Sequence, residues 1–330
     1  MSEPILRVED LRVYFYTYAG VVKAVEGVSF EVYSGEVFGL IGETGCGKTV
    51  TSRALTRLIP DPGRIEGGRV LFRINSEWVD LLKLPDSELR KIRGSLISYI
   101  FQDPSSALDP LYTAGYQVAE TIIAHNRVSW KEAWLKAIDA LRSVLIPDPE
   151  ARVKNYPHEL SGGMKQRVVI GTSIVNEPKL LIADEPTTNV DVTIQAQIID
   201  LLHQLKNLRR TSIMLITHNM GLIAEMADRV AVMYAGRIAE IANVYTLFEE
   251  PLHPYTQGLI RCVPDPTKEI KELYPIPGTV PDLINPPKGC RFWPRCSKAM
   301  DICKREVPPR VEVSKGHFVE CWLYAGGGHE

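Results

Sequence analysis

The stretch EVFGLIGETGCGKTVTSRALTRLI, residues 36–59, decides the fold class of this chain. Its apolar run Val37–Ile41 is bounded by turn signals and predicts a short buried strand. Residues 42–49 fit the pattern G-x-x-x-x-G-K-[ST], and apolar residues at helical spacing follow to about Leu58. A strand, a glycine-rich loop and a helix in this order are typical of a phosphate-binding loop in an α/β fold. The alternative is a chance glycine-rich turn, which the correct flanks disfavour.

The residue types in this loop are those needed to bind the phosphates of a nucleotide. Glycines let the backbone curl so that successive N–H groups face phosphate oxygens, and the helix N-terminus adds its positive dipole end. We expect Lys48 to contact the β- and γ-phosphates and the hydroxyl of Thr49 to bind Mg²⁺. Cys46 is interpreted as a small side chain rather than a redox site. The loop residues expected to contact ATP are Gly42, Thr44, Gly45, Cys46, Gly47, Lys48 and Thr49.

Length and composition are those of an ordinary globular protein with room for two or three domains. The 330 residues are 45% hydrophobic and 24% charged, and the formal net charge is −2. This charge gives no sign of binding to nucleic acid or to an anionic membrane. No apolar run reaches the roughly 18 residues needed to span a bilayer, and the first residues, MSEPILRVEDLRV, lack a signal-peptide core. We therefore expect a cytoplasmic protein whose membrane association goes through partners.

An acidic pair in PKLLIADEPTT supplies the next part of a nucleotide site. Leu180–Ala183 predict a buried parallel strand that ends in Asp184 and Glu185. The carboxyl ends of strands are where open α/β sheets bind ligands. We expect Asp184 to hold Mg²⁺ and Glu185 to polarise the attacking water. The alternative, two acids that cap the following helix, is disfavoured by the strand context and by the phosphate-binding loop.

A serine and two glycines in YPHELSGGMKQRVVIGTSIV predict a helix start. Ser161, Gly162 and Gly163 offer a hydroxyl and unhindered backbone N–H groups, which suit an anion. Taken alone, this tripeptide also fits a serine-capped helix that binds nothing.

The combination of LSGG, residues 160–163, with IADEP in a chain that has a phosphate-binding loop resembles the ATP-binding cassette (ABC) transporter ATPases. Gln102 in YIFQDP matches the family's glutamine that joins the core to a helical subdomain. Asp191 in TTNVD matches the D-loop aspartate, and His218 in MLITHN matches the switch histidine at the γ-phosphate. The resemblance implies that Phe15, with Tyr16 as the alternative, stacks on adenine. It implies Mg²⁺ bound through Thr49, Gln102 and Asp184, and Glu185, His218 and Lys48 as the catalytic residues.

The same resemblance implies the architecture and the mechanism. The fold expected is α/β, a RecA-like P-loop core over residues 1–102 and 158–247 with an antiparallel β subdomain and an inserted helical subdomain over 103–157. Two cassettes would associate head to tail, so that Ser161, Gly162 and Gly163 act on the partner's ATP. Two departures stand out: Met164 replaces the commoner Gln or Glu, and Asn189-Val190 replaces Ala-Leu in the D-loop. The first leaves the Ser and Gly donors in place.

Four clustered cysteines mark the proline-rich segment after Leu247, taken as a C-terminal domain over residues 248–330. Five, six and seventeen residues separate the cysteines in turn, and thiols in a reducing compartment favour metal over disulfides. Zinc ribbons prefer closer pairs, so the gaps favour a [4Fe–4S] cluster, with zinc as the alternative and unligated thiols as a third reading. Cys262 is interpreted as a packing residue and His317 as a turn residue. The expected ligands are Cys290, Cys296, Cys303 and Cys321.

The segment HPYTQGL followed by GCRFWPRC resembles the C-terminal extension of dipeptide/oligopeptide importer ATPases, in which the four cysteines are taken to bind a [4Fe–4S] cluster. This implies a peripheral subunit at the cytoplasmic face of the membrane. Its partners would be a second homologous ATPase or a second copy, two transmembrane permease subunits and an extracytoplasmic binding protein, with no nucleic acid. The alternatives are import of oligosaccharides or nickel, a soluble ABC ATPase of translation or DNA repair, and a degenerate cassette. Lys48, Glu185 and His218 argue against the last of these.

Overall fold

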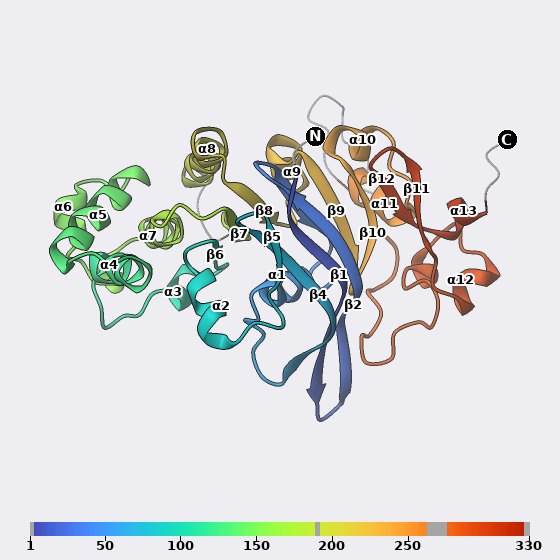
Figure 1. The fold of residues 1–330 in the computed structure, drawn as a ribbon. Coiled ribbons are helices and arrows are strands. Elements are labelled where there is room, and N and C mark those ends of the chain that lie inside the picture. Colours follow the sequence, from blue (N-terminus) through green and yellow to red (C-terminus); the bar gives the residue numbers. More distant parts are fainter. Residues whose placement is uncertain (1–2, 189–191, 263–275, 327–330) are drawn as a thin grey trace. The chain divides into compact units, whose positions relative to one another are not determined.

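The computed structural model of the chain describes residues 3–188, 192–262 and 276–326 (Figure 1). Contacts divide the chain into two compact units. The first unit consists of Met1–Glu3, Tyr33–Val37 and Lys83–Leu215. The second consists of Pro4–Val32, Phe38–Leu82 and Ile216–Glu330.

A four-stranded antiparallel sheet forms one layer of the second unit. Its strands run in the order β2 (Gly20–Tyr33), β1 (Pro4–Thr17), β4 (Gly63–Ile74) and β5 (Glu77–Asp80). The buried residues of β1 are Leu6, Val8, Leu11 and Val13, so the buried face changes from even to odd numbers. The register against β4 shifts between Glu9 and Arg12, and this bulge returns the apolar side chains to the core face.

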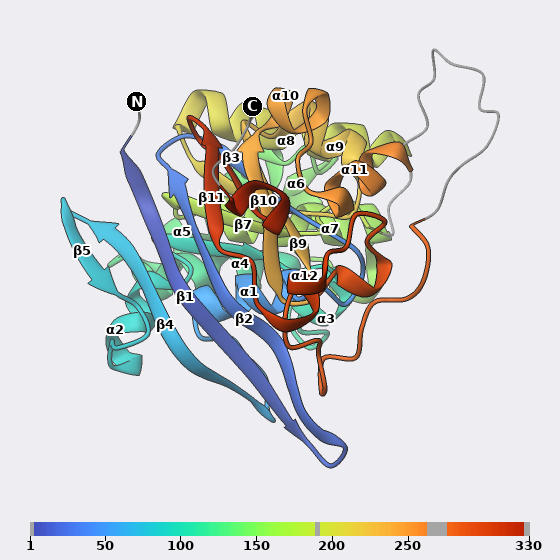
Figure 2. The same ribbon diagram turned by 90° about the vertical axis from the view of Figure 1, so that its right-hand side faces the viewer.

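A second group of strands carries the predicted phosphate-binding loop. Its order is β11 (Arg310–Ser314), β12 (His317–Glu320), β10 (Arg237–Asn243), β9 (Arg229–Tyr234) and β3 (Val37–Ile41). The strand predicted over Val37–Ile41 is confirmed, is buried at every residue and lies parallel to β9. The other neighbours pair antiparallel, and β12 pairs with β10 through Ile241 and Phe318. Figure 2 labels β9, β10 and β11 of this group. Strands from the end of the chain thus extend the sheet that contains β3.

The helix after the loop is shorter than the sequence predicts. Helix α1 spans Lys48–Leu55 and ends three residues before Leu58. Arg57 has a φ of +55°, and the N–H of Leu58 donates to the carbonyl of Arg53 at 2.8 Å. A left-handed residue with this backward hydrogen bond closes the helix. The other helices of this unit are α9 (Met220–Met226), α10 (Val244–Glu249), α11 (Pro254–Arg261), η2 (Trp293–Arg295), α12 (Asp301–Arg305) and α13 (Trp322–Ala325).

The first unit contains three strands in the order β8 (Ser212–Ile216), β7 (Leu180–Asp184) and β6 (Ile97–Ile100). All five residues of β7 and of β8 are buried, as expected for strands covered on both faces. β6 and β7 are parallel, so their carboxyl ends lie at the same edge. The helices of this unit are α2 (Asp86–Ile92), α3 (Pro104–Ala107), α4 (Ala114–His125), α5 (Trp130–Ser143), α6 (Pro149–Arg152), η1 (Pro157–Glu159), α7 (Gly162–Ile174) and α8 (Val192–Arg209).

Helices occupy most of the segment between Gln102 and the LSGG sequence at residues 160–163, called the signature below. α4 packs against α5, and both contact α7. α5 begins as the sequence predicts: the hydroxyl of Ser129 accepts a hydrogen bond from the N–H of Glu132 at 3.2 Å. The carboxylate of Glu132 pairs with Lys136, one turn on, at 3.1 Å.

Candidate functional site

The phosphate-binding loop connects β3 to α1, and its backbone needs glycine at two tightly packed positions. Gly42 has a φ of +152° and Gly47 a φ of +102°. A Cβ on Gly42 would collide with the carbonyl oxygen of Met233, and one on Gly47 with that of Ala24. The loop is therefore wrapped closely against neighbouring backbone, as a phosphate cradle requires.

Lys48 lies inside this loop and is only 6% exposed. Its Nζ donates to the carbonyl oxygens of Gly42 at 2.7 Å and Glu43 at 3.1 Å. Cys46 is fully buried, and burial raises the pKa of its thiol. The ammonium group is thus placed by loop carbonyls, and the thiol fits the interpretation of Cys46 as a small packed side chain.

Three further predicted residues, Phe15, its alternative Tyr16 and His218, belong to the same unit as the loop. Phe15 is half-buried and pairs with Gly63, and a Cβ on Gly63 would lie 2.7 Å from Phe15 Cε1. Tyr16 is 43% exposed, and its hydroxyl donates to Glu66 at 2.8 Å. His218 is exposed and directly follows Thr217, whose N–H donates to the carbonyl of Leu40 in β3 at 3.3 Å.

The first unit brings the predicted acids and Gln102 together at the carboxyl ends of β6 and β7. Asp184 is 1% exposed and accepts a hydrogen bond from the hydroxyl of Tyr99 at 2.7 Å. Gln102 Nε2 and Thr188 Oγ1 donate to Glu185 Oε2 at 2.8 and 3.0 Å. Glu185 has a φ of +48°, a conformation that non-glycine residues rarely adopt and that clusters at functional sites.

Ser161 caps α7 as the sequence predicts, and its hydroxyl accepts from the N–H of Met164 at 3.3 Å. Ser161 and Gly162 are exposed, and a Cβ on Gly162 would meet nothing within 4 Å. Further along α7, Gln166 is buried and donates to the carbonyl of Pro186 at 2.8 Å. This bond ties the signature helix to the turn that carries Glu185. Asp191, with Asn189 and Val190, lies outside the described residues.

Sequence reasoning missed Tyr99 and Gln166. Both lie inside quoted motifs, three residues before Gln102 and five after Ser161. A tyrosine or glutamine in an apolar context indicates that its polar group has a hydrogen-bond partner in the fold. The sequence does not identify these partners, because they lie 85 and 20 residues away.

The four cysteines predicted as ligands come from segments around η2, α12 and α13. Cys303 and Cys321 are buried, Cys290 and Cys296 are half-buried, and the N–H of Cys290 donates to the carbonyl of Cys303 at 2.8 Å. Burial raises the pKa of Cys290 to about 11 and that of Cys321 to about 12. Across the described ranges, no cysteine forms a disulfide and no group of three or more His, Cys, Asp or Glu could hold a metal ion as it stands. The arrangement therefore gives no support to the predicted cluster or to zinc.

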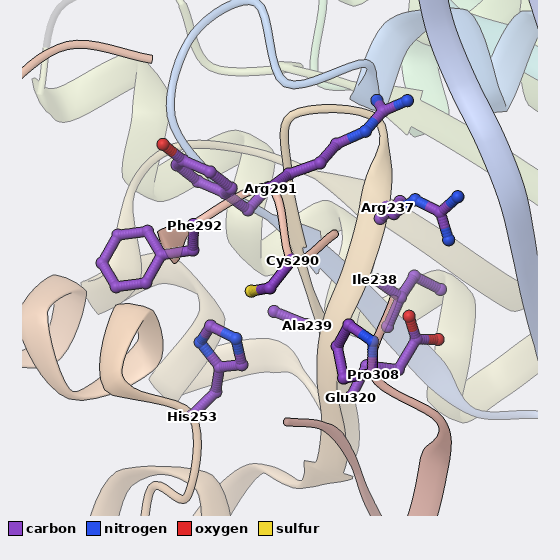
Figure 3. Close-up of a pocket in the computed structure, with 10 residues that line it drawn as sticks. Arg237, Ile238, Ala239, His253, Cys290, Arg291, Phe292, Pro308 and Glu320 are labelled. Carbon is purple, nitrogen blue, oxygen red and sulfur yellow. The ribbon is translucent and has the colours of Figure 1, made fainter. Parts of the chain in front are cut away.

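A small cavity of about 30 Å³ lies beside Cys290. Figure 3 shows Cys290, His253 and Phe292 around it, with Glu320 on the facing side. His253 Nδ1 accepts from the N–H of Tyr255 at 3.0 Å, and burial lowers the pKa of His253 to about 4. His253 therefore lines this cavity as a neutral imidazole, together with Cys290.

Comparison with known proteins places the chain among transporter ATPases. It is 48% identical to the dipeptide transport ATP-binding protein DppD of Bacillus subtilis, over 97% of this chain and 95% of that protein. Residues 25–188 match the family model described as ABC transporter. The chain belongs to the ABC transporter family. As an ATPase of that family it hydrolyses ATP to ADP and phosphate.

Other ABC transporter proteins extend the comparison. The oligopeptide transport ATP-binding protein OppD of B. subtilis is 48% identical over 97% of this chain and 88% of its own length. Residues 239–303 match the model described as oligopeptide/dipeptide transporter, C-terminal region. The solved ATP-binding cassette MJ0796, in a dimeric post-hydrolysis state with ADP and Pi, has a TM-score of 0.65, with 24% identity, over 72% of this chain and 98% of that one. It confirms the ABC ATPase fold.

Most of the predicted site residues of this ABC transporter ATPase lie in one or the other of the two matched segments. The loop, the signature and the acids fall within residues 25–188, whereas Phe15 and His218 fall outside. The second segment contains Cys290, Cys296 and Cys303. Among the described helices, none has the length and apolar character needed to cross a bilayer.

Proposed function

We propose that this ABC transporter ATPase energises the import of dipeptides or oligopeptides across the cytoplasmic membrane. One observation carries the proposal: residues 239–303 match the C-terminal region of oligopeptide and dipeptide transporters in a chain that aligns with DppD over 97% of its length. The subunit would act at the cytoplasmic face of the membrane as a peripheral protein.

The binding of ATP with Mg²⁺ is assigned to the predicted residues. The loop N–H groups and Lys48 would hold the phosphates, and Phe15 would stack on adenine. Thr49, Gln102 and Asp184 would hold Mg²⁺, which supplies charge neutralisation at the phosphates. Oxygen donors of this kind suit Mg²⁺, and Gln102 donates through Nε2, so its amide oxygen is the atom suited to a cation.

Glu185 would act as the general base. Gln102 and Thr188 both donate to Oε2, so the carboxylate is held in one orientation at the carboxyl end of β7. His218 would contact the γ-phosphate, and Asp191 would act in the D-loop. The positive φ of Glu185 is a rarely populated conformation of the kind that clusters at active sites, which supports an active-site role.

The signature would complete the site of a second ATPase subunit. Ser161 and Gly162 are exposed at the N-terminus of a 13-residue helix, where N–H groups favour an anion. We propose a head-to-tail dimer with a homologous ATPase or a second copy. Residues 103–157 would form the helical subdomain that contacts two permease subunits, fed by an extracytoplasmic binding protein.

Deletion of the gene in its host tests the transported substrate. Uptake of a labelled dipeptide should be lost and should return with the wild-type gene but not with Glu185→Gln. Nickel and an oligosaccharide serve as parallel substrates in the same strains. Unchanged dipeptide uptake with loss of either of the others would overturn the peptide assignment.

We further propose that Cys290, Cys296, Cys303 and Cys321 hold a [4Fe–4S] cluster. The thiols as they stand do not form a metal site, so the support is the chemistry of the donors. Burial disfavours the thiolates, whereas the backbone N–H of Phe292 lowers the pKa of Cys290 and that of Leu323 lowers the pKa of Cys321. N–H groups aimed at sulfur are suited to a ligand thiolate.

Such a cluster would link the segments around η2, α12 and α13. Protein purified without oxygen should contain about four iron and four sulfide per chain, and Cys296→Ser should lose them. Cys262→Ser is the matched control and should keep both. One zinc per chain, or no metal, would contradict the cluster.

A further inference from the structure

The segment between Cys290 and Cys296 contacts the phosphate-binding loop directly. Arg295, at the end of η2, is 9% exposed. Its Nη1 donates to Glu43 Oε2 at 2.7 Å and its Nη2 to Glu43 Oε1 at 3.1 Å. Glu43 is the second residue of the loop, next to Gly42. This two-pronged pairing of a guanidinium with a carboxylate is strong and geometrically specific.

Every polar group of Glu43 is engaged. Its N–H donates to the hydroxyl of Tyr255 at 2.9 Å, and Tyr255 is fully buried. Its carbonyl accepts from Lys48 Nζ at 3.1 Å and from the N–H of Cys46 at 3.2 Å. The carboxylate takes both prongs of Arg295. Two of these partners come from the C-terminal segment, and a third is the lysine that would contact the phosphates.

Arg295 is itself held rigidly. Nε donates to the carbonyl of Pro277 at 2.8 Å and Nη2 to that of Ile276 at 3.1 Å. The guanidinium lies over the ring of Tyr234, 5.7 Å from its centroid. Since its other donors are already used, the guanidinium presents Glu43 with a fixed fork, and little side-chain freedom is lost when the pair forms.

A second arginine of the same segment supports the loop from the opposite flank. Arg291 donates to the carbonyl of Ala235 and pairs with Glu26 at 3.3 Å. The next residue, Gly236, donates its N–H to the carbonyl of Cys46 at 2.8 Å. Arg291, beside Cys290, thus anchors backbone that touches the loop, and Arg295, beside Cys296, binds a side chain of the loop.

We propose that Arg295 is a positioning residue of the ATP site and that the C-terminal segment controls nucleotide affinity through it. The loop carries a carboxylate where a triphosphate must bind, and an unpaired Glu43 would repel the phosphates and compete for Lys48. Arg295 neutralises this charge and holds it to one side. The role is distinct from transport specificity and from metal binding, since it concerns ATP affinity alone.

The test is the KM for ATP of the full chain in steady-state hydrolysis. Arg295→Gln should raise KM by about tenfold, within the roughly 5–150-fold range of coupling between sites, with a smaller change in kcat. Adding Glu43→Gln should recover most of the affinity, because the repulsive charge is then gone. A residue that merely supports the fold would not be rescued by removal of its partner's charge.

Arg310→Gln is the matched control. Arg310 lies in the same C-terminal segment, donates to the carbonyl of Ser29 at 2.9 Å and packs over Phe318. Its loss should leave the KM for ATP unchanged. Arg295→Lys keeps the positive charge but cannot make the two parallel hydrogen bonds of the guanidinium. It should raise the KM for ATP by a smaller factor than Arg295→Gln, and it replaces that variant in the test if Arg295→Gln does not fold. An unchanged KM in a folded Arg295 variant, or a double variant no better than Arg295→Gln, would overturn the proposal.

Discussion

A buried contact between His317 and Glu240 attaches the last strands of the chain to the sheet of the second unit, and its removal gives a quantitative prediction. His317 Nε2 lies 2.7 Å from Glu240 Oε1, and the two side chains are 5% and 0% exposed. Glu240 also accepts from the N–H groups of Leu252 and His253, both at 2.9 Å. β12 begins at His317, so the imidazole sits where the strand joins β10.

We predict that His317→Ala destabilises the fold by about 2–4 kcal/mol. Removing one partner of a buried hydrogen bond costs about 1–3 kcal/mol when the other group is left unsatisfied, and more when that group is charged. Glu240 keeps two N–H donors, which lowers this figure, while the lost ring leaves a small cavity that raises it. His317→Gln retains a donor and should cost about half as much.

Thermal unfolding followed by circular dichroism measures this difference, with His158→Ala as an exposed control that should lie within about 0.5 kcal/mol of wild type. Hydrogen exchange at residues 317–320 should rise more than at β9 in His317→Ala. If the alanine variant is no less stable than the glutamine variant, the Glu240–His317 pair does not anchor β12 as reasoned.

Three further predictions concern the ATP site and pH. Glu185→Gln should reduce ATP hydrolysis by about 10²–10⁴-fold while a fluorescent ATP analogue still binds, and undiminished hydrolysis would remove the general-base role. Phe15→Ala should weaken ATP binding by about 1 kcal/mol or more, measured by titration, whereas Tyr16→Ala should not; the reverse order would assign adenine to Tyr16. His253 is neutral in the fold because burial lowers its pKa to about 4, so the unfolded chain binds the extra proton. Stability should therefore fall as pH drops from about 6.5 towards 4, by about 1.4 kcal/mol per unit at most, and His253→Asn should flatten this slope in urea unfolding at each pH.

Local patterns predicted the elements of the nucleotide site with little error. The five-residue apolar runs before the loop and before Asp184 became β3 and β7, and Ser161 caps the helix expected after it. Each of these depends on residues close in sequence, where hydrophobic period and capping chemistry are informative. The end of α1 was not predicted because Arg57 adopts a left-handed backbone conformation, which is rare for arginine and is not indicated by the sequence.

The contacts of the C-terminal segment could not be read from the sequence. His317 was interpreted as a turn residue, yet its partner Glu240 is 77 positions earlier. Arg295 and Glu43 are 252 positions apart, and neither residue type identifies its partner. Charged residues in a loop are usually solvated, so only the fold could show that this arginine is buried against the phosphate-binding loop.

The HPY sequence, residues 253–255, now has a physical explanation. His253 caps α11 by accepting the N–H of Tyr255 on Nδ1, and Pro254 occupies the first helical position, where no N–H is needed. This start aims the fully buried Tyr255 at the backbone N–H of Glu43. The motif lies within residues 239–303, the segment matched to the C-terminal region of oligopeptide and dipeptide transporters. Its tyrosine and Arg295 both contact Glu43. The segment matched to the transporters' C-terminal region therefore touches the loop that we propose binds ATP.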